Sequence, residues 1–84
     1  MHLKITVYGL LGELLKKDIP REACFYKTGP VSLKEALAEV GLTGNDLQWI
    51  AVEIDGELAK KDILDDYLDK DEVEISVYPV FAGG

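Results

Sequence analysis

The two ends of the chain share an alternation of apolar and polar residues. The apolar positions are Leu3, Ile5 and Val7 near the start, and Val73, Ile75 and Val77 near the end. A period of two predicts a strand with one apolar face. Because the two faces match, we expect the first and last strands to lie side by side at the centre of one sheet.

The strongest helix signal lies between these ends. Ser32, followed three residues later by Glu35, forms a capping box. The apolar stripe that follows consists of Leu33, Ala36, Leu37 and Val40. Its spacing is helical, and Gly41 is a typical helix stop. The sequence therefore predicts one main helix that can lie across one face of a sheet.

The remaining segments predict short elements. Residues 9–17 read as a loop opening into a short helix, residues 22–27 as a short strand, 49–54 as a strand, 57–59 as its hairpin partner and 63–67 as one helical turn. Asp55-Gly56 is a strong hairpin turn signal. The order predicts an α+β fold with a mixed sheet of four to five strands and one main helix packed across it.

Eighty-four residues make one small domain. We expect a folded domain over 1–78 and a flexible tail over 79–84. The predicted core consists of Leu3, Ile5, Val7, Leu33, Leu37, Val40, Val52, Ile54, Val73, Ile75 and Val77. Cys24 lies in a strand-like segment, and we expect it to be a buried, inert side chain rather than a reactive thiol.

Composition argues against catalysis by this chain. It has one cysteine and one histidine, so a zinc site, an intrachain disulfide and a Ser-His or Cys-His nucleophile are not expected. Nothing in it predicts a bound cofactor or a phosphate loop. No apolar run approaches the roughly 18 residues of a membrane span, and the start has no signal-peptide layout. We expect a cytoplasmic protein.

The negative charge is concentrated in one part of the chain. Residues 1–49 contain six acidic and six basic residues, whereas residues 50–84 contain ten acidic residues and three lysines. Such a chain is repelled by nucleic acid and by anionic membranes. The acidic part either favours a basic docking surface on a protein partner or serves only solubility.

The sequence stops on Gly83-Gly84, soon after the last predicted strand. Two residues without side chains can enter a narrow channel and present a carboxylate inside a partner. The alternative is an ordinary frayed, glycine-rich terminus. Between strand and glycines stand Pro79, Val80, Phe81 and Ala82.

These features together resemble the β-grasp, ubiquitin-like sulfur carriers of the MoaD/ThiS family. The resemblance covers nearly the whole chain, and residues 68–73 and 79–84 match the family most specifically; residues 51–57 resemble its hairpin. The helical stretch after the first strand favours MoaD over ThiS. Lys70, Val80 and Phe81 depart from the usual residues, which leaves the identity of the receiving enzyme open.

The resemblance implies a mechanism. A ubiquitin-activating-type enzyme adenylates the carboxylate of Gly84 with ATP, and a persulfide converts it to a thiocarboxylate. The sulfur then passes to a second partner, such as the large subunit of molybdopterin synthase. Gly83 keeps the tail slim, and Pro79 fixes its direction or merely ends the strand. Phe81 and Ala82 fill the channel entrance, or Phe81 packs on its own domain.

Other functions stay open on sequence grounds. The carrier could serve thiamin synthesis or tRNA thiolation. It could instead be a modifier joined to lysines, or an interaction module whose glycines are incidental.

Overall fold

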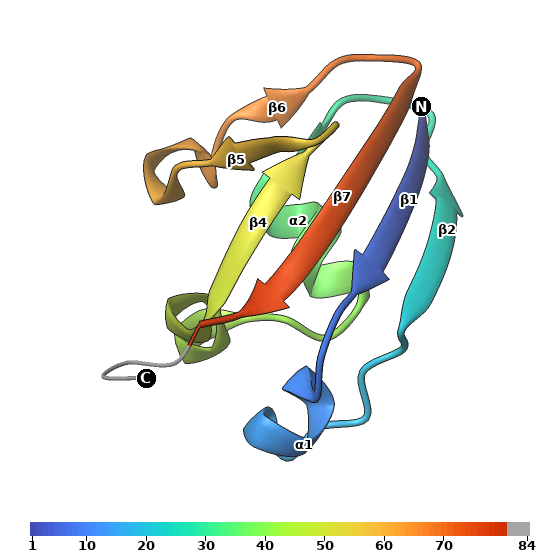
Figure 1. Cartoon of the computed structure of the whole chain (residues 1–84). Coiled ribbons are helices and arrows are strands. Elements are labelled where there is room, and N and C mark those ends of the chain that lie inside the picture. Colours follow the sequence, from blue (N-terminus) through green and yellow to red (C-terminus); the bar gives the residue numbers. More distant parts are fainter. Residues whose placement is uncertain (81–84) are drawn as a thin grey trace.

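The computed structural model describes residues 1–80, apart from the side chain of Lys61 (Figure 1). Along the chain the strands are β1 (His2–Val7), β2 (Glu22–Tyr26), β3 (Val31–Ser32), β4 (Ile50–Ile54), β5 (Glu57–Ala59), β6 (Tyr67–Leu68) and β7 (Glu72–Pro79). The helices are α1 (Leu11–Leu15) and α2 (Leu33–Glu39), with 3-10 turns η1 (Gly44–Trp49) and η2 (Lys61–Ile63).

The main sheet has five strands in the order β2-β1-β7-β4-β5. The first and last strands are parallel neighbours, with Leu3 opposite Val73 and Val7 opposite Val77. The other pairs in this sheet are antiparallel. Figure 1 shows α2 across one face and the other face open. The structure therefore confirms a mixed sheet with one main helix and the two end strands together.

The structure shows the predicted hairpin turn and one of the two hydrogen bonds of the predicted capping box. The Ser32 Oγ accepts a hydrogen bond from the Glu35 N–H at 3.1 Å and so caps α2. Asp55 and Gly56 have φ of 51° and 86°, the left-handed values that a two-residue type I′ hairpin turn requires. The Asp55 carboxylate accepts from the Glu74 N–H at 3.0 Å and from Lys70 Nζ at 3.1 Å. These two donors hold the pKa of Asp55 below its usual value.

One apolar core fills the space between the sheet and α2. Every predicted core residue is buried, except that Ile54 is half-buried against the cluster. The core also includes residues that were not predicted: Leu11, Val31, Ala36, Leu42 and Ile50. Leu11 extends the core under α1, so the short helix packs onto the domain.

Two predictions were wrong. Cys24 is exposed rather than buried, because Ala23 and Phe25 face the core while Cys24 lies opposite the exposed Lys4 on the uncovered face of the sheet. The alternation then turns Cys24 to solvent. Tyr67 does not continue a helical turn: η2 ends at Ile63, and Tyr67 pairs with Ser32 in a separate two-stranded sheet of β3 and β6.

Candidate functional site at the end of the central strand

The predicted functional residues begin where β7 ends. The sequence predicts Pro79 at the start of the tail, but Pro79 is the last residue of β7 and lies opposite Ile50. The Val80 N–H donates to the Trp49 carbonyl at 2.8 Å, so both Pro79 and Val80 are tied to the sheet. Phe81, Ala82, Gly83 and Gly84 lie outside the described residues.

A glycine from the other end of the chain lies against Pro79. Gly9 has a φ of +71°, and a Cβ on it would lie 3.0 Å from the Pro79 Cγ. Any larger residue there would be strained and would push on the proline ring. Gly9 thus permits a close contact that fixes where the last residue of β7 sits. This contact joins two residues that are seventy positions apart.

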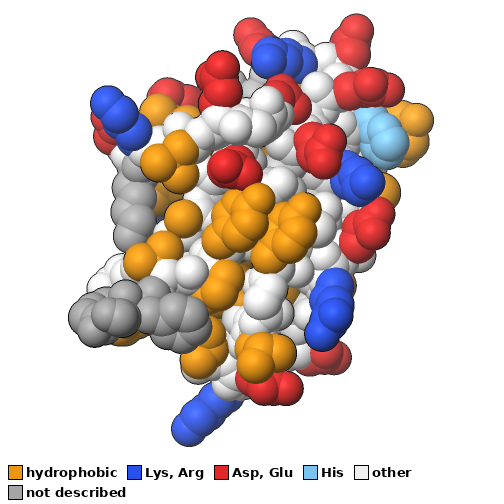
Figure 2. Space-filling view, viewed as in Figure 1, with side chains coloured by type: hydrophobic (Ala, Val, Ile, Leu, Met, Phe, Trp, Pro, Cys, Tyr) orange, Lys and Arg blue, Asp and Glu red, His pale blue; other side chains and the backbone are white. Residues whose placement is uncertain are grey.

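Two tyrosines stack on the open face of the sheet beside this point. The rings of Tyr8 and Tyr78 are 4.8 Å apart and within 7° of parallel. The Tyr78 hydroxyl donates to Glu53 Oε1 at 2.9 Å, and this bond to a carboxylate raises the pKa of Tyr78. Figure 2 shows hydrophobic side chains across the middle of this face, with most acidic side chains toward the end where β7 begins.

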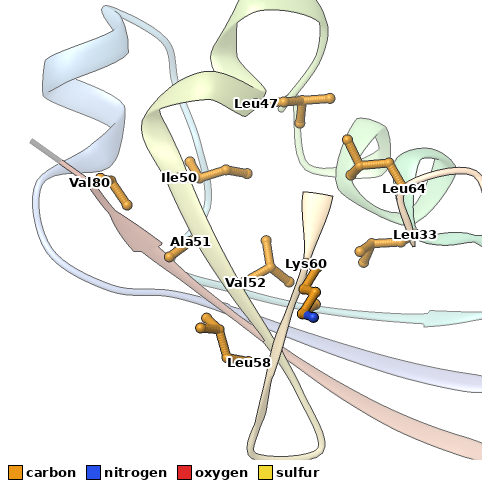
Figure 3. A pocket seen from close by; sticks show the side chains of 10 residues that line it. Leu33, Leu47, Ile50, Ala51, Val52, Leu58, Lys60, Leu64 and Val80 are labelled. Carbon is orange, nitrogen blue, oxygen red and sulfur yellow. The ribbon is translucent and has the colours of Figure 1, made fainter. Parts of the chain in front are cut away.

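Two apolar hollows flank Val80. The first, here called the β4–β5 groove, has a volume of about 380 Å³ and is lined by Leu33, Leu47, Ile50, Ala51, Val52, Leu58, Ala59, Lys60, Leu64 and Val80 (Figure 3). The second, called the α1 hollow, has about 260 Å³ and is lined by Leu11, Leu14, Leu15, Trp49 and Val80. Val80 is common to both. The chain therefore leaves the sheet between two apolar surfaces.

An ion pair holds together the elements that line the α1 hollow. Lys17, just after α1, donates to the carboxylate of Asp46 in η1 and to the Gly41 carbonyl, the latter at 3.1 Å. The same carboxylate accepts from the Thr43 N–H at 3.1 Å. Chiefly through the Lys17 hydrogen bond, these contacts lower the pKa of Asp46. The pair thus fixes α1 relative to the segment leading into β4.

Comparisons with known proteins identify the fold of the chain through similar solved structures. No family model and no curated protein matches the chain. Several solved chains do, and two of them are described here. SAMP1 from Haloferax volcanii matches with a TM-score of 0.66 and 20% identity, over 100% of both chains. A chain of the complex of subunits 1 and 2 of molybdopterin-converting factor from Helicobacter pylori 26695 matches with 0.60 and 20%, again over 100% of both.

The chain has the ubiquitin-like β-grasp fold. In this β-grasp domain the candidate site is the surface around the end of β7, and among residues 1–80 no cleft there brings reactive side chains together. Within residues 1–80 no three His, Cys, Asp or Glu side chains gather in a way that could hold a metal ion. In the same part of the chain, no helix combines the length and the apolar character needed to cross a membrane.

The sequence did not predict the surroundings of Pro79 and Val80, where β7 ends. It identified Pro79 and Val80, but not the Tyr8–Tyr78 stack, the Gly9 contact or the two hollows. One signal was available for the stack. Tyr8 and Tyr78 each follow the last core residue of matching strands, so parallel pairing of Val7 with Val77 puts the rings on the same face.

The Asp46 ion pair in the β-grasp domain gives a pH-dependent stability. The folded-state pKa lies below the ordinary value of 3.8, so the stabilisation is present above that pH and is lost as pH falls through the folded pKa. We expect Asp46→Asn to be less stable than wild type at pH 7, because asparagine keeps the Thr43 bond but not the charge. The difference in the free energy of unfolding between wild type and Asp46→Asn should become smaller below about pH 4, where the Asp46 carboxylate of the wild type begins to be protonated. Urea unfolding at a series of pH values measures it.

Asp18→Asn is the matched control, since Asp18 is an exposed acid of the neighbouring loop without an ion pair among the described residues. Equal pH profiles for the two variants would show that the Lys17–Asp46 pair does not stabilise the fold.

Proposed function

We propose that this chain is a ubiquitin-like sulfur carrier that is activated at the carboxyl group of Gly84. The observation that supports it most is the place where the last strand ends. β7, the central strand of a β-grasp sheet, ends beside two apolar hollows and continues into Phe81-Ala82-Gly83-Gly84. A rigid domain that holds a slim, apolar chain end suits delivery of that end into another protein.

The proposed chemistry takes place on partner enzymes. The Gly84 carboxylate attacks the α-phosphate of ATP on a ubiquitin-activating-type enzyme, and pyrophosphate leaves. A persulfide sulfur then attacks the acyl carbon and displaces AMP. A thiol cleaves the resulting acyl disulfide, which leaves a thiocarboxylate on Gly84 and a disulfide on the donor. This chain supplies the acyl group and no catalytic side chain, so it is a carrier and not an enzyme.

The proposed roles of the tail residues follow from size and shape. Gly83 and Gly84 are narrow enough for a channel, and Ala82 adds one methyl group. Pro79, held by Gly9 and paired with Ile50, sets the direction in which the tail leaves the sheet. Phe81 contacts the entrance of the channel in the bound state.

The proposed acceptor is a large-subunit partner of the molybdopterin synthase kind, and the sulfur enters molybdopterin. One comparison supports this choice: the structural neighbour from Helicobacter pylori was solved as a complex of two subunits of molybdopterin-converting factor. The ubiquitin-like fold and the Gly-Gly end fit a second candidate equally in geometry, a modifier that is joined to lysine side chains. Carriers for thiamin synthesis or tRNA thiolation use the same tail chemistry.

Intact-protein mass spectrometry tests the proposal. The chain is incubated with ATP, its adenylating enzyme and a persulfide donor, and the expected product is heavier by the exchange of one oxygen for sulfur. Isopeptide-linked conjugates in place of that product would support the modifier. A carrier protein that the same enzyme is known to convert serves as the positive control. If that carrier gains mass and this chain does not, the proposed activation of Gly84 is refuted.

Association with the adenylating enzyme should depend on salt. On the face shown in Figure 2, most acidic side chains lie toward the end of the sheet away from the end of β7, so we expect them to act through their summed electrostatic field rather than through direct contacts with the enzyme. Such steering raises association rates and is screened over a Debye length of about 10 Å at 0.1 M salt. In stopped-flow measurements, higher ionic strength should slow association much more than dissociation. Salt-independent association would leave the acidic part a solubilising surface.

A further inference from the structure

The β4–β5 groove is an exposed apolar surface without a partner among residues 1–80. Nine of its ten lining residues are apolar, with Lys60 the exception. Leu58 is 72% exposed and Val80 43% exposed. Figure 3 shows Leu47 and Leu64 on the side of the helical segments and Leu58 and Val80 on the side of the sheet. Covering such a surface removes apolar area from water at about 25 cal/mol per Å².

The groove exists because the hairpin is short. β5 pairs with Val52–Ile54 and not with the first two residues of β4. Along Ile50 and Ala51, the side of β4 opposite β7 therefore has no neighbouring strand in the described part of the chain. The space that a longer β5 would fill remains open between the sheet and Leu64.

The tail begins at the edge of this groove. Val80 lines it, and its N–H is fixed to the Trp49 carbonyl at 2.8 Å. The next Cα is about 3.8 Å farther along the chain, so residue 81 starts within side-chain reach of the groove. Among residues 81–84, Phe81 is the one large apolar side chain, and the others are alanine and glycine.

We infer that the β4–β5 groove binds the Phe81 side chain of the same chain when no partner holds the tail. The docking is intramolecular, so the effective concentration of Phe81 at the groove is about millimolar or higher. A separate ligand must compete with that. An aromatic side chain buries about 150–250 Å² when fully enclosed. No other residue among 81–84 has enough apolar surface to bury a comparable area.

A second copy of the chain is a poorer occupant. Exposed acidic residues stand in the segments that form the groove wall: Glu57 in β5, Asp62 in η2 and Asp65 just after it. The chain has a formal net charge of −7. Although Lys60 also lines the groove, two chains that each carry this net negative charge repel one another, which disfavours self-association.

Docking of Phe81 has a consequence that rests on the proposed function. A partner that takes the tail in extended form competes with the groove for Phe81. The apparent affinity of that partner equals its intrinsic affinity multiplied by the fraction of chains in which Phe81 is undocked. The groove is then a regulatory site: it retains Phe81, and with it the C-terminal glycines, on the domain until a partner binds the tail.

Methyl NMR on the full chain tests the docking without any enzyme, so its outcome is separate from that of the proposed function. We expect nuclear Overhauser contacts between the Phe81 ring and the methyl groups of Leu58 and Leu64. Those methyl resonances should lie upfield in wild type and lose the ring-current shift in Phe81→Ala. The matched control is Tyr26→Ala, which removes an 83% exposed ring from β2 and should leave both methyl groups unchanged.

Leu58→Asp provides a second test. It places a charge in the groove at an exposed position, so the Phe81 contacts to Leu64 should disappear while the buried Leu3 and Leu37 methyl resonances stay in place. Identical groove resonances in wild type and Phe81→Ala, with no contacts to the ring, would overturn the inference. Shifts that grow with protein concentration would overturn it in favour of a second copy in the groove.

Discussion

Removing Gly84 is expected to abolish the acyl adenylate and the thiocarboxylate while the domain stays folded. The last described hydrogen bond of the sheet comes from Val80, and the buried core within residues 1–80 lies entirely before it. The free energy of unfolding should therefore change by less than about 0.5 kcal/mol. The loss of activation follows because the acyl group then sits one residue short of the position that the partner aligns with ATP.

A second tail variant separates length from shape. Gly83→Val keeps the length but adds a β-branched side chain that widens the tail and restricts its backbone, so activation should fall nearly as far. Gly29→Val is the matched control, because it makes the same substitution at an exposed turn where an added Cβ meets no other atom within 4 Å, and it should leave activation unchanged. Mass spectrometry measures product formation, and urea unfolding measures stability. If the chain without Gly84 gains the same mass as the intact chain, the carrier proposal fails.

Leu37→Ala is expected to lower the free energy of unfolding by about 2–5 kcal/mol. Leu37 is fully buried on the face of α2 that packs against the sheet, so truncation leaves a cavity that the surrounding strands fill incompletely. For a domain of this size a loss of that order is a large part of the total stability. Thermal or urea unfolding followed by circular dichroism measures it.

Leu10→Ala provides the control for this prediction. Leu10 is 58% exposed at the N-cap of α1, and neither leucine nor alanine is a good cap. Its cost should stay near 0.5 kcal/mol or below, as expected for an ordinary surface substitution. Equal losses for Leu10→Ala and Leu37→Ala would mean that α2 does not pack on the sheet as described.

Elements with strong local chemistry could be predicted from the sequence. Ser32 and Glu35 determine the start of α2 through one capping interaction, and Asp55-Gly56 determines a hairpin through its backbone preferences. The alternation of the end strands was long enough to show which face is buried. Each of these signals is contained within about eight residues, so no knowledge of the tertiary structure was required.

The errors arose where a segment is too short or faces two environments. β3 and β6 have two residues each, which is too short for an alternating pattern of apolar and polar residues to be recognised. The segment Ala23-Cys24-Phe25 contains only apolar side chains, so its pattern does not say which face of β2 meets the core. The buried face depends on the register of β2 against β1 and on which face of the sheet α2 covers.

The candidate site shows the same division. Pro79 and Val80 were found because they precede the glycines in sequence. The contact of Gly9 with Pro79, the stack of Tyr8 on Tyr78 and the groove beside Val80 depend on which strands become neighbours. A single sequence predicts such contacts only after the strand order and the parallel register of β1 and β7 are known.

The pairing of β1 with β7 also determines when the domain can form during synthesis. His2 lies opposite Glu72 and Val7 opposite Val77, so β1 leaves the ribosome well before the strand with which it pairs. Contacts between such distant segments give a high contact order and comparatively slow folding. Until β7 has emerged, β1 lacks its central neighbour and exposes apolar side chains that chaperones recognise. A nascent chain therefore displays no finished domain to a partner before the segment that leads into the glycines has been made.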